Sequence, residues 1–337
     1  MAYSRGGKIE KGDYNDNIVG STTSTSSTNI NTIWAVGSSK AGYGQTAISN
    51  VSQFGKVSGD DWVGLIGTIN KIRSHTNTAG SAYDTTKFQT GQPVTYVPSV
   101  TTDISSLYTN KNNAVAQAGT VTADTVTVTN STTWLDYLTF THTITFANGN
   151  AARYFFNAGG QLALTFSHPT GSGANAYFNA LATALGTIVI SSPNTGTVTI
   201  AGTDYNGVTK IGGSGINSAT TTNWQNYGYY GLTTTYTEVY RQTGSGLTGF
   251  GGVSYNSSYI SISVKTSAVQ GSNADNGATI TIQVTFDEVP NGLINSANTS
   301  VALTVRRPST TYLTNTWGTV NAVTGTNISV SGSVTGA

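Results

Sequence analysis

The segment LTFTHTITF, residues 138–146, alternates between apolar and polar side chains. Every even-numbered position except His142 is apolar, and every odd-numbered position is threonine. Side chains of a β-strand point alternately to the two faces of its sheet, so this period of two predicts a strand with one buried face and one threonine face. The segment therefore predicts a sheet that covers a core on one side only.

The same period returns in the C-terminal part of the chain. Ile260, Ile262 and Val264 alternate with polar residues, and residues 279–286 do likewise. The intervening QGSNADNG, residues 270–277, is typical of a hairpin loop. Further strands are expected at residues 232–241 and 301–306, with short strands or extended chain from residue 319.

A short helix is expected directly after the first strand. An Asn-Gly turn signal stands at residues 148–149, and Asn150 can cap a helix over residues 151–156. The glycine pair at 159–160 can end this helix in the left-handed conformation. Since large aromatic side chains most often serve as core, we expect Phe155 and Phe156 to pack beneath the sheet rather than to bind a ligand.

The pattern of helix and strand then repeats. Apolar spacing predicts a helix over residues 177–185 and a strand over residues 187–190. Pro193 and Asn194 favour a turn, which would lead into a second strand at residues 197–200.

The N-terminal part follows a helical period instead. Ser58 can cap a helix whose first turn holds Asp60 and Asp61, because carboxylates suit the positive end of the helix dipole. An apolar stripe at helical spacing runs from Trp62 towards His75. Weaker helices are expected at residues 13–19 and 102–118, and residues 21–28 should form a low-complexity surface loop.

These patterns predict a mainly β protein of the α+β class. An N-terminal helical region, residues 1–120, would be followed by antiparallel or mixed β-rich domains with short inserted helices. The expected division is an α+β domain at residues 121–231 and a β-rich C-terminal domain at residues 232–337.

Composition excludes several classes of partner. Charged residues make up 9% of the chain and the net charge is +1, so no basic face is available for nucleic acid or for an anionic membrane surface. The chain has no cysteine, hence no disulfide and no thiolate metal site. It has neither a signal-type leader nor a run of 18 apolar residues, so we expect assembly in a cytoplasm and no membrane span.

No sequence pattern indicates catalytic or metal-binding residues. The three histidines lack a carboxylate or a second histidine at ligand or triad spacing, so a structural role is expected for them. The adjacent acids Asp60-Asp61 and Asp287-Glu288 are explained by a helix cap and by a strand end. Asp275-Asn276-Gly277 lacks the spaced ligands of a calcium loop, and no glycine-rich stretch matches a phosphate loop. We expect no enzyme activity, no cofactor and no metal.

One aromatic cluster could bind a ligand. The segment WQNYGYYG, residues 224–231, places Trp224, Tyr227, Tyr229 and Tyr230 beside Asn and Gln, and such side chains can stack on sugar faces. The alternative, which we favour, is that they pack in the core or across a subunit interface.

Four segments together resemble virion structural proteins of contractile-tailed phages that infect cyanobacteria. They are MAYSRGGKIEKGDYN (1–15), AGYGQTAISNVSQFGKVSGDDWVGLIGTINKIRSH (41–75), ARYFFNAGGQLALTFSH (152–168) and YYGLTTTYTEVYR (229–241). The resemblance implies a non-enzymatic component of a neck, tail, baseplate or fibre appendage, assembled with other virion proteins in the host bacterial cytoplasm. It implies no catalytic residue.

Assembly is also expected on physical grounds. Uncharged strands with Thr and Ser on one face can pair across subunits without like-charge repulsion, and assembly would cover exposed sheet edges. We expect a homo-oligomer, in particular a homotrimer. Its helical region would attach to the particle through Trp34, Tyr43 and Trp62. The alternative function is an adhesin that binds a host-surface glycan through the aromatic cluster, and a polysaccharide depolymerase is the least favoured.

Overall fold

The computed structural model shows a β-rich α+β fold with three antiparallel sheets and one N-terminal helical region. It describes residues 12–20, 28–52, 55–88, 100–115, 117–118, 125–213, 224–244, 257–273, 275–289, 295–318 and 328–336.

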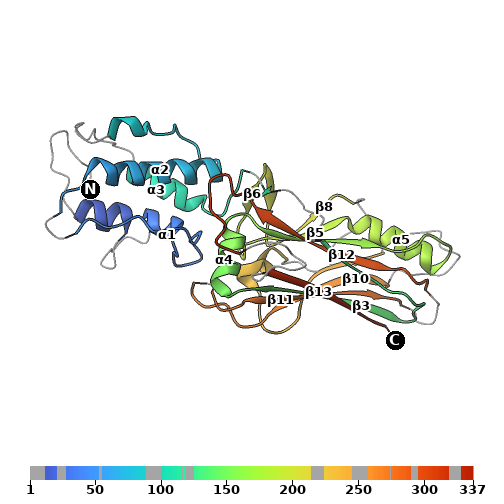
Figure 1. The fold of residues 1–337 in the computed structure, drawn as a ribbon. Helices are drawn as coiled ribbons and strands as arrows, with labels where there is room; N and C mark the ends of the chain where they lie inside the picture. Colours follow the sequence, from blue (N-terminus) through green and yellow to red (C-terminus); the bar gives the residue numbers. More distant parts are fainter. Residues whose placement is uncertain are drawn as a thin grey trace.

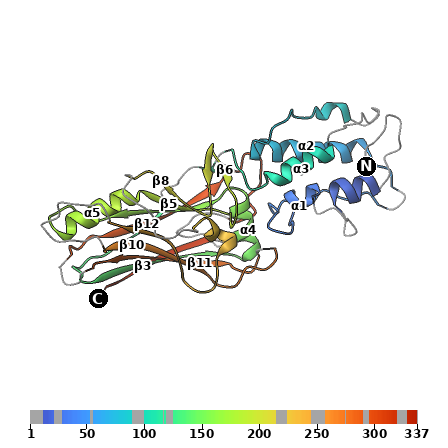
Figure 2. The same ribbon diagram turned by 180° about the vertical axis from the view of Figure 1, so that it is seen from behind.

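The molecule is elongated and has two parts. The helices of the first 110 residues gather at one end, and two layers of strands extend away from them (Figure 1). The reverse view shows the same separation, with the C-terminal strand ending far from the helices (Figure 2). The fold is therefore a β-sandwich that carries a helical region at one end.

One layer is a five-stranded antiparallel sheet. Its order is β13-β3-β11-β10-β9, with β3 (Tyr137–Phe146) between β13 and β11. The expected hairpin joins β10 to β11, and Ile260 pairs with Phe286. The other strands of this sheet are β9 (Thr237–Thr243), β10 (Tyr259–Thr266), β11 (Thr279–Asp287) and β13 (Ile328–Gly336).

The other layer is a six-stranded sheet of order β1-β12-β4-β5-β8, with β2 also paired to β12. Its strands are β1 (Gln117–Ala118), β2 (Thr125–Thr129), β4 (Gln161–Ser167), β5 (Thr187–Ile190), β8 (Val208–Ile211) and β12 (Ser300–Pro308). A separate hairpin of β6 (Val198–Ile200) and β7 (Thr203–Tyr205) packs on the outer side of this sheet, against Ala163 and Val189.

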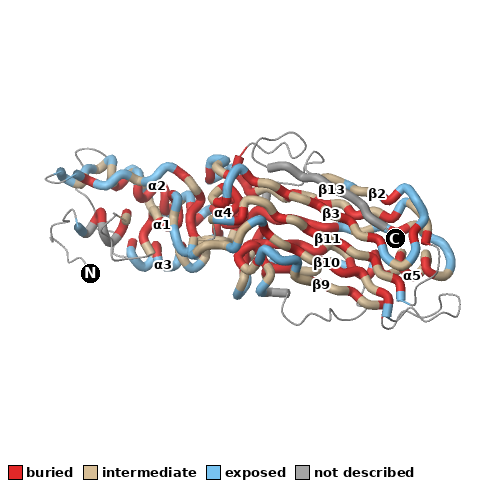
Figure 3. Tube along the Cα trace, turned by 90° about the horizontal axis from the view of Figure 1, so that it is seen from below, coloured by how far each residue is buried: buried red, intermediate tan, exposed pale blue. Residues whose placement is uncertain are grey.

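The period of two on β3 is confirmed. Leu138 and the following even-numbered residues are buried, and the threonines between them are half-exposed (Figure 3). The ring centroids of Phe140 on β3 and Phe286 on β11 lie 5.8 Å apart in the core. The threonines lie on the outer face, where the hydroxyls of Thr139 and Thr285 are 3.0 Å apart across the two strands.

Two short helices close the sandwich. Helix α4 (Gly149–Asn157) lies at the end next to the helical region, and α5 (Ala174–Leu185) packs between the two sheets at one side. Phe155 and Phe156 on α4 are fully buried against Phe146 of β3, so their expected core role is confirmed. Gly159 follows α4 with φ of 95°, as expected for the end of this helix.

The helical region is built around α2 (Gly59–Thr76). Ser58 accepts a hydrogen bond from the Asp61 backbone, and Asp61 accepts one from the Ser58 backbone, which confirms the expected helix start and forms a capping box. The region also contains η1 (Asp13–Val19), α1 (Ile30–Trp34), η2 (Thr85–Phe88) and α3 (Val100–Thr109).

Several expected boundaries differ from the structure. Both sheets take strands from either side of residue 231, so the expected boundary there falls inside one sandwich. The strand expected at residues 197–200 is present as β6 (Val198–Ile200), which pairs with β7, while β5 pairs with β4 and β8. The cap of α4 is Asn148 rather than Asn150. Helix α3 ends at Thr109 rather than near residue 118. Residues 21–27 and 319–327 lie outside the described residues.

The two faces of β3 should respond differently to truncation. Phe140→Ala removes a fully buried ring, so the free energy of unfolding should fall by about 3–5 kcal/mol. The neighbouring Thr141→Ala lies on the outer face and should change it by less than about 1 kcal/mol. Urea denaturation of both variants measures the difference, and equal losses would contradict the assignment of faces.

Candidate functional site

The helical region and the sandwich meet at a polar junction. We define the junction as the segment 35–45 after α1, the helix α4, and residues 314–318 after β12. The segment turns back on itself: the Gly44 amide donates to Ala35 O at 2.8 Å and the Gln45 amide donates to Trp34 O at 3.0 Å. This fold places the carbonyl groups of the segment against α4.

Arg153 on α4 is the centre of the junction. Its side chain is only 1% exposed, and Nη2 donates to Val36 O and to Asn150 Oδ1, both at 2.8 Å. Nη1 donates to Asn273 O at 3.3 Å. A buried cation is costly without hydrogen-bond acceptors, so this guanidinium ties two distant segments, at Val36 and Asn273, to α4.

Further hydrogen bonds cross the junction. Asn157 Nδ2 donates to Gly42 O at 2.9 Å, and the Tyr230 hydroxyl lies 3.1 Å from Lys40 O. Tyr230 also donates to Asn157 Oδ1. Gln45 pairs twice with the backbone of Thr314, with both distances at 2.9 Å. The junction is therefore held from two sides of the sandwich.

A second connection runs through Ala114. Its amide donates to Thr199 O at 2.9 Å and its carbonyl accepts from the Ala201 amide at 2.8 Å. The next amide, of Val115, donates to His75 O at 2.6 Å. The end of α2 is thus tied to the β6–β7 hairpin, and the helical region is attached at two places.

The three residues expected to attach the chain to a particle are buried within it. Trp34 donates from Nε1 to Thr46 O at 3.0 Å, and Trp62 packs edge-on against Tyr14. Tyr43 is fully buried and donates to Lys111 O. These side chains support the helical region from inside, so any surface that attaches it must use other residues.

The aromatic cluster at residues 224–231 contains both buried and half-buried side chains. Tyr229 and Tyr230 are buried, and the Tyr229 ring stacks on Phe156 with centroids 4.5 Å apart. For these two residues the core interpretation holds over ligand binding. Tyr227 is half-buried, and the side chain of Trp224 lies outside the described residues.

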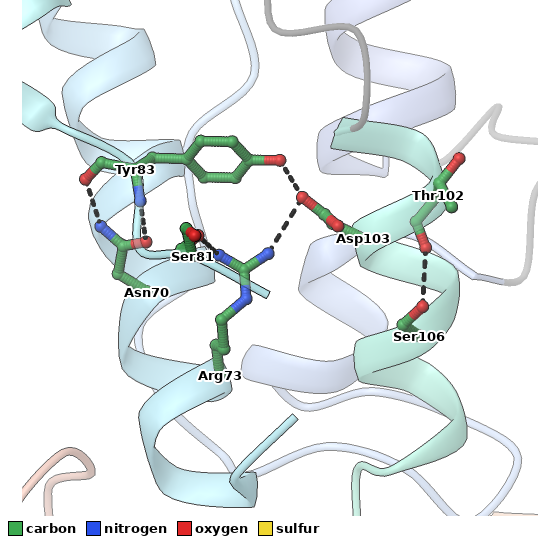
Figure 4. A network of polar contacts seen from close by, with 7 residues as sticks. All are labelled: Asn70, Arg73, Ser81, Tyr83, Thr102, Asp103 and Ser106. Atoms are coloured by element: carbon green, nitrogen blue, oxygen red, sulfur yellow. Dashed lines mark hydrogen bonds and ion pairs between the residues drawn. The ribbon is translucent and has the colours of Figure 1, made fainter. Parts of the chain in front are cut away.

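A closed polar cluster joins α2 to α3 (Figure 4). Arg73 Nη2 lies 2.9 Å from Asp103 Oδ2, with the two side chains 7% and 21% exposed. Tyr83 donates its hydroxyl to Asp103, and Asn70 pairs with both backbone groups of Tyr83. Arg73 also donates to Ser81 O at 2.5 Å. Each of these polar groups already serves another group in the cluster, so its role is to hold the helices together.

The three histidines are buried. Burial lowers the pKa of His75 and of His142 to about 4, and it also lowers the pKa of His168. His142 lies on the core face of β3, and neither ring nitrogen has a hydrogen-bond partner among the described residues. Among all the residues that the structure describes, no group of three His, Asp or Glu side chains is placed to hold a metal ion.

The described helices include none that is both long and apolar enough to cross a membrane. Comparison with protein-family models, with curated proteins and with solved structures finds no match to this chain.

Sequence reasoning missed Arg153 and Gln45. One signal was present, because Arg153 is the only charged residue in the segment AARYFFNAGG, residues 151–160. A lone cation inside an aromatic helix indicates a buried group with fixed partners. Its two backbone partners, Val36 and Asn273, lie more than 100 residues away, and no local pattern reveals them.

Loss of the Arg153 guanidinium should loosen the junction. Arg153→Met keeps the length of the side chain but leaves Val36 O and Asn273 O without their donor, so amides of residues 36–45 should exchange faster with deuterium and the free energy of unfolding should fall by about 2–4 kcal/mol. Hydrogen-exchange mass spectrometry measures the first effect. Arg306→Met is the matched control, since Arg306 makes one long contact of 3.5 Å with Gln161. Unchanged exchange in Arg153→Met would contradict the role of this side chain.

Stability should fall on acidification because of the buried histidines. The folded-state pKa of His142, about 4, lies below its ordinary value of 6.5, so the unfolded chain binds more protons between these values. The contribution of His142 is complete above pH 6.5 and is lost as the pH falls towards 4. Between these limits the wild-type protein should lose about 3 kcal/mol more stability than His142→Leu. Urea denaturation across this range tests it, and parallel curves for the two proteins would contradict the assignment.

Proposed function

We propose that this chain is a non-enzymatic structural protein of a virion, a homo-oligomeric component of a neck, tail, baseplate or fibre appendage. The observation that carries the proposal is the two-part form, in which hydrogen bonds of the buried junction join a helical region to the end of a projecting sandwich. A particle component needs one end for attachment and one end that projects. The resemblance of four sequence segments to phage virion proteins supports the same role.

The surface of the sandwich suits contact with further copies. The outer face of the five-stranded sheet presents Thr139, Thr141, Thr143 and Thr145 from β3, beside threonines of β11. Such a face can meet an identical face without electrostatic repulsion. The low charge of the whole chain, 9%, favours association over solubility as a monomer.

Two edge strands offer a route to assembly. Strands β2 and β13 run along the same side of the sandwich, and each pairs with only one strand among the described residues (Figure 3). The sequence of β2, TVTVT, contains no charge or proline that would block pairing with another chain. We infer that this side contacts a second copy.

Glycan recognition through residues 224–231 is the second candidate function. Because Tyr229 and Tyr230 are buried, glycan binding by this cluster would depend on Tyr227 and Trp224. If these two residues bind a host glycan, their replacement by alanine should reduce adsorption of the particle to the host. A depolymerase is not proposed, because the described residues contain no constellation that supports one.

The native mass tests assembly. For a trimer, light scattering of the purified protein should give about 105 kDa, three times the chain mass of 34.9 kDa. Thr127→Lys places a charge on the exposed part of β2 and should shift the mass towards that of one chain. Thr101→Lys, at an exposed position of α3, is the control and should leave the mass unchanged.

A wild-type protein with the mass of a single chain would contradict the proposed assembly. An oligomer that Thr127→Lys does not weaken would move the interface away from the β2 edge. Gold-labelled antibodies against the recombinant protein, applied to purified phage particles, test the virion assignment separately. Absence of label from intact and from partially disassembled particles would contradict it.

A further inference from the structure

The outer face of the five-stranded sheet changes character along its length. Threonine and serine occupy most of it, but aromatic and charged side chains gather where β3 begins and β11 ends. The other end of β3 leads into α4 and the junction, so this group lies at the end of the sandwich farthest from the helical region (Figure 1). We call Tyr137, Glu238, Arg241, Tyr259 and Asp287 the distal strip.

The register of the sheet brings the strip together. Asp287 on β11 pairs with Tyr137 on β3 and with Tyr259 on β10, so the three residues form one row across three strands. The next residue inward on each strand is buried in the core: Leu138, Phe286 and Ile260. The row therefore lies on the outer face. The Cα atoms of its two tyrosines are about 10 Å apart, because neighbouring strands are about 4.8 Å apart.

One half of the strip is held in place by its own contacts. The Tyr259 hydroxyl donates to Asp287 Oδ2 at 2.9 Å, and the Arg241 guanidinium carbon lies 3.7 Å from the centre of the Tyr259 ring. Arg241 Nε donates to both carboxylate oxygens of Glu238 at 2.9 Å. These contacts fix the Tyr259 ring and the Asp287 carboxylate before any ligand arrives, which lowers the entropy cost of binding.

The other half is open. Tyr137 is 43% exposed, and its side chain has no hydrogen-bond or ring partner among the described residues. In the same part of the chain, Asp287 Oδ1 accepts no hydrogen bond, so one carboxylate oxygen next to an exposed tyrosine ring remains available. An aromatic face beside a fixed acceptor is unusual on a surface made of threonine and serine.

We propose that the distal strip binds a neutral saccharide. The apolar C–H face of a sugar ring packs on the Tyr137 ring, and a sugar hydroxyl donates to Asp287 Oδ1 in a charge-assisted hydrogen bond. The threonine hydroxyls of the neighbouring row supply further polar contacts.

The charge of the strip selects against acidic sugars. Glu238 and Asp287 carry two negative charges and Arg241 carries one positive charge, which leaves a net charge of −1. Arg241 is already paired on both sides, with Glu238 and with the Tyr259 ring, so it is not free to bind a sialic acid carboxylate or a sulfate. Neutral hexoses and their N-acetyl derivatives are therefore the favoured class.

This inference does not depend on the virion assignment, and it requires that contact with further copies leave the distal end of the outer face uncovered. It also differs in place from the aromatic cluster at residues 224–231, whose tyrosines 229 and 230 are buried. On a projecting component, a saccharide site at the distal end would be directed away from the attached end.

The test is binding of the full-length protein to an array of immobilised neutral, sialylated and sulfated oligosaccharides, followed by calorimetric titration of each soluble neutral sugar that binds. We expect binding to at least one neutral sugar and to none of the acidic ones. Tyr137→Ala and Asp287→Asn should each weaken binding about tenfold or more, and Tyr137→Phe, which keeps the ring, should bind within about threefold of the wild type.

Thr141→Ala, on the outer face of the same strand, is the control and should bind as the wild type does. Tyr137 is exposed, so its alanine variant should keep the melting temperature and isolates binding from folding even if Asp287→Asn proves unstable. Failure to bind any neutral sugar, binding restricted to acidic sugars, or unchanged affinity in Tyr137→Ala would each overturn the proposal. None of these results would alter the native mass or the labelling of particles, which test the structural role.

Discussion

The buried guanidinium of Arg153 sets the relation between the two parts of the molecule. Its donors end on the carbonyls of Val36 and Asn273 and on the side chain of Asn150. An ionised group in the interior is costly without hydrogen-bond partners. The segment after α1 is therefore held where the Val36 carbonyl meets Arg153 on α4. Most of the polar contacts across the junction use backbone carbonyls rather than carboxylates, in keeping with a chain that has only 14 acidic residues. The described contacts that connect the two parts at this junction are therefore hydrogen bonds rather than ion pairs.

The sandwich depends on a different constraint, the strict division of its strands into two faces. The inner faces of β3, β10 and β11 are apolar, and their outer faces are mainly threonine and serine. Burial of the inner faces stabilises each sheet against the other. The outer face contributes little to that core, which leaves it open to contacts with other molecules. Both proposals made for the outer surface, contact with further copies and binding of a saccharide at its distal end, follow from this division.

Local patterns predicted the elements well where one signal dominated. The capping box at Ser58 and the alternation on β3 and β11 were legible because cap geometry and side-chain direction are set within a few residues. Helix α1 was missed because its five residues, INTIW, are too few to show a helical period. The strands at residues 187–190 and 197–200 were predicted but their partners were not, because pairing of β5 with β4 and β8, and of β6 with β7, is decided by tertiary structure. The candidate sites were less predictable than the elements: Trp34, Tyr43 and Trp62 have the composition of an interface, but all three lie inside the chain.

The sequence by itself determined the class of the fold, the helical character of the N-terminal region, the strand faces and the low charge of the chain. These properties depend on composition and on spacings of two to four residues. Only the tertiary structure decided the order of the strands, the burial of Tyr229 and Tyr230, the partners of Arg153, and the meeting of Tyr137, Asp287 and Tyr259 in one row. The reason is physical: these contacts join residues far apart along the chain, and strand pairing and packing select among many arrangements that the same local periods allow.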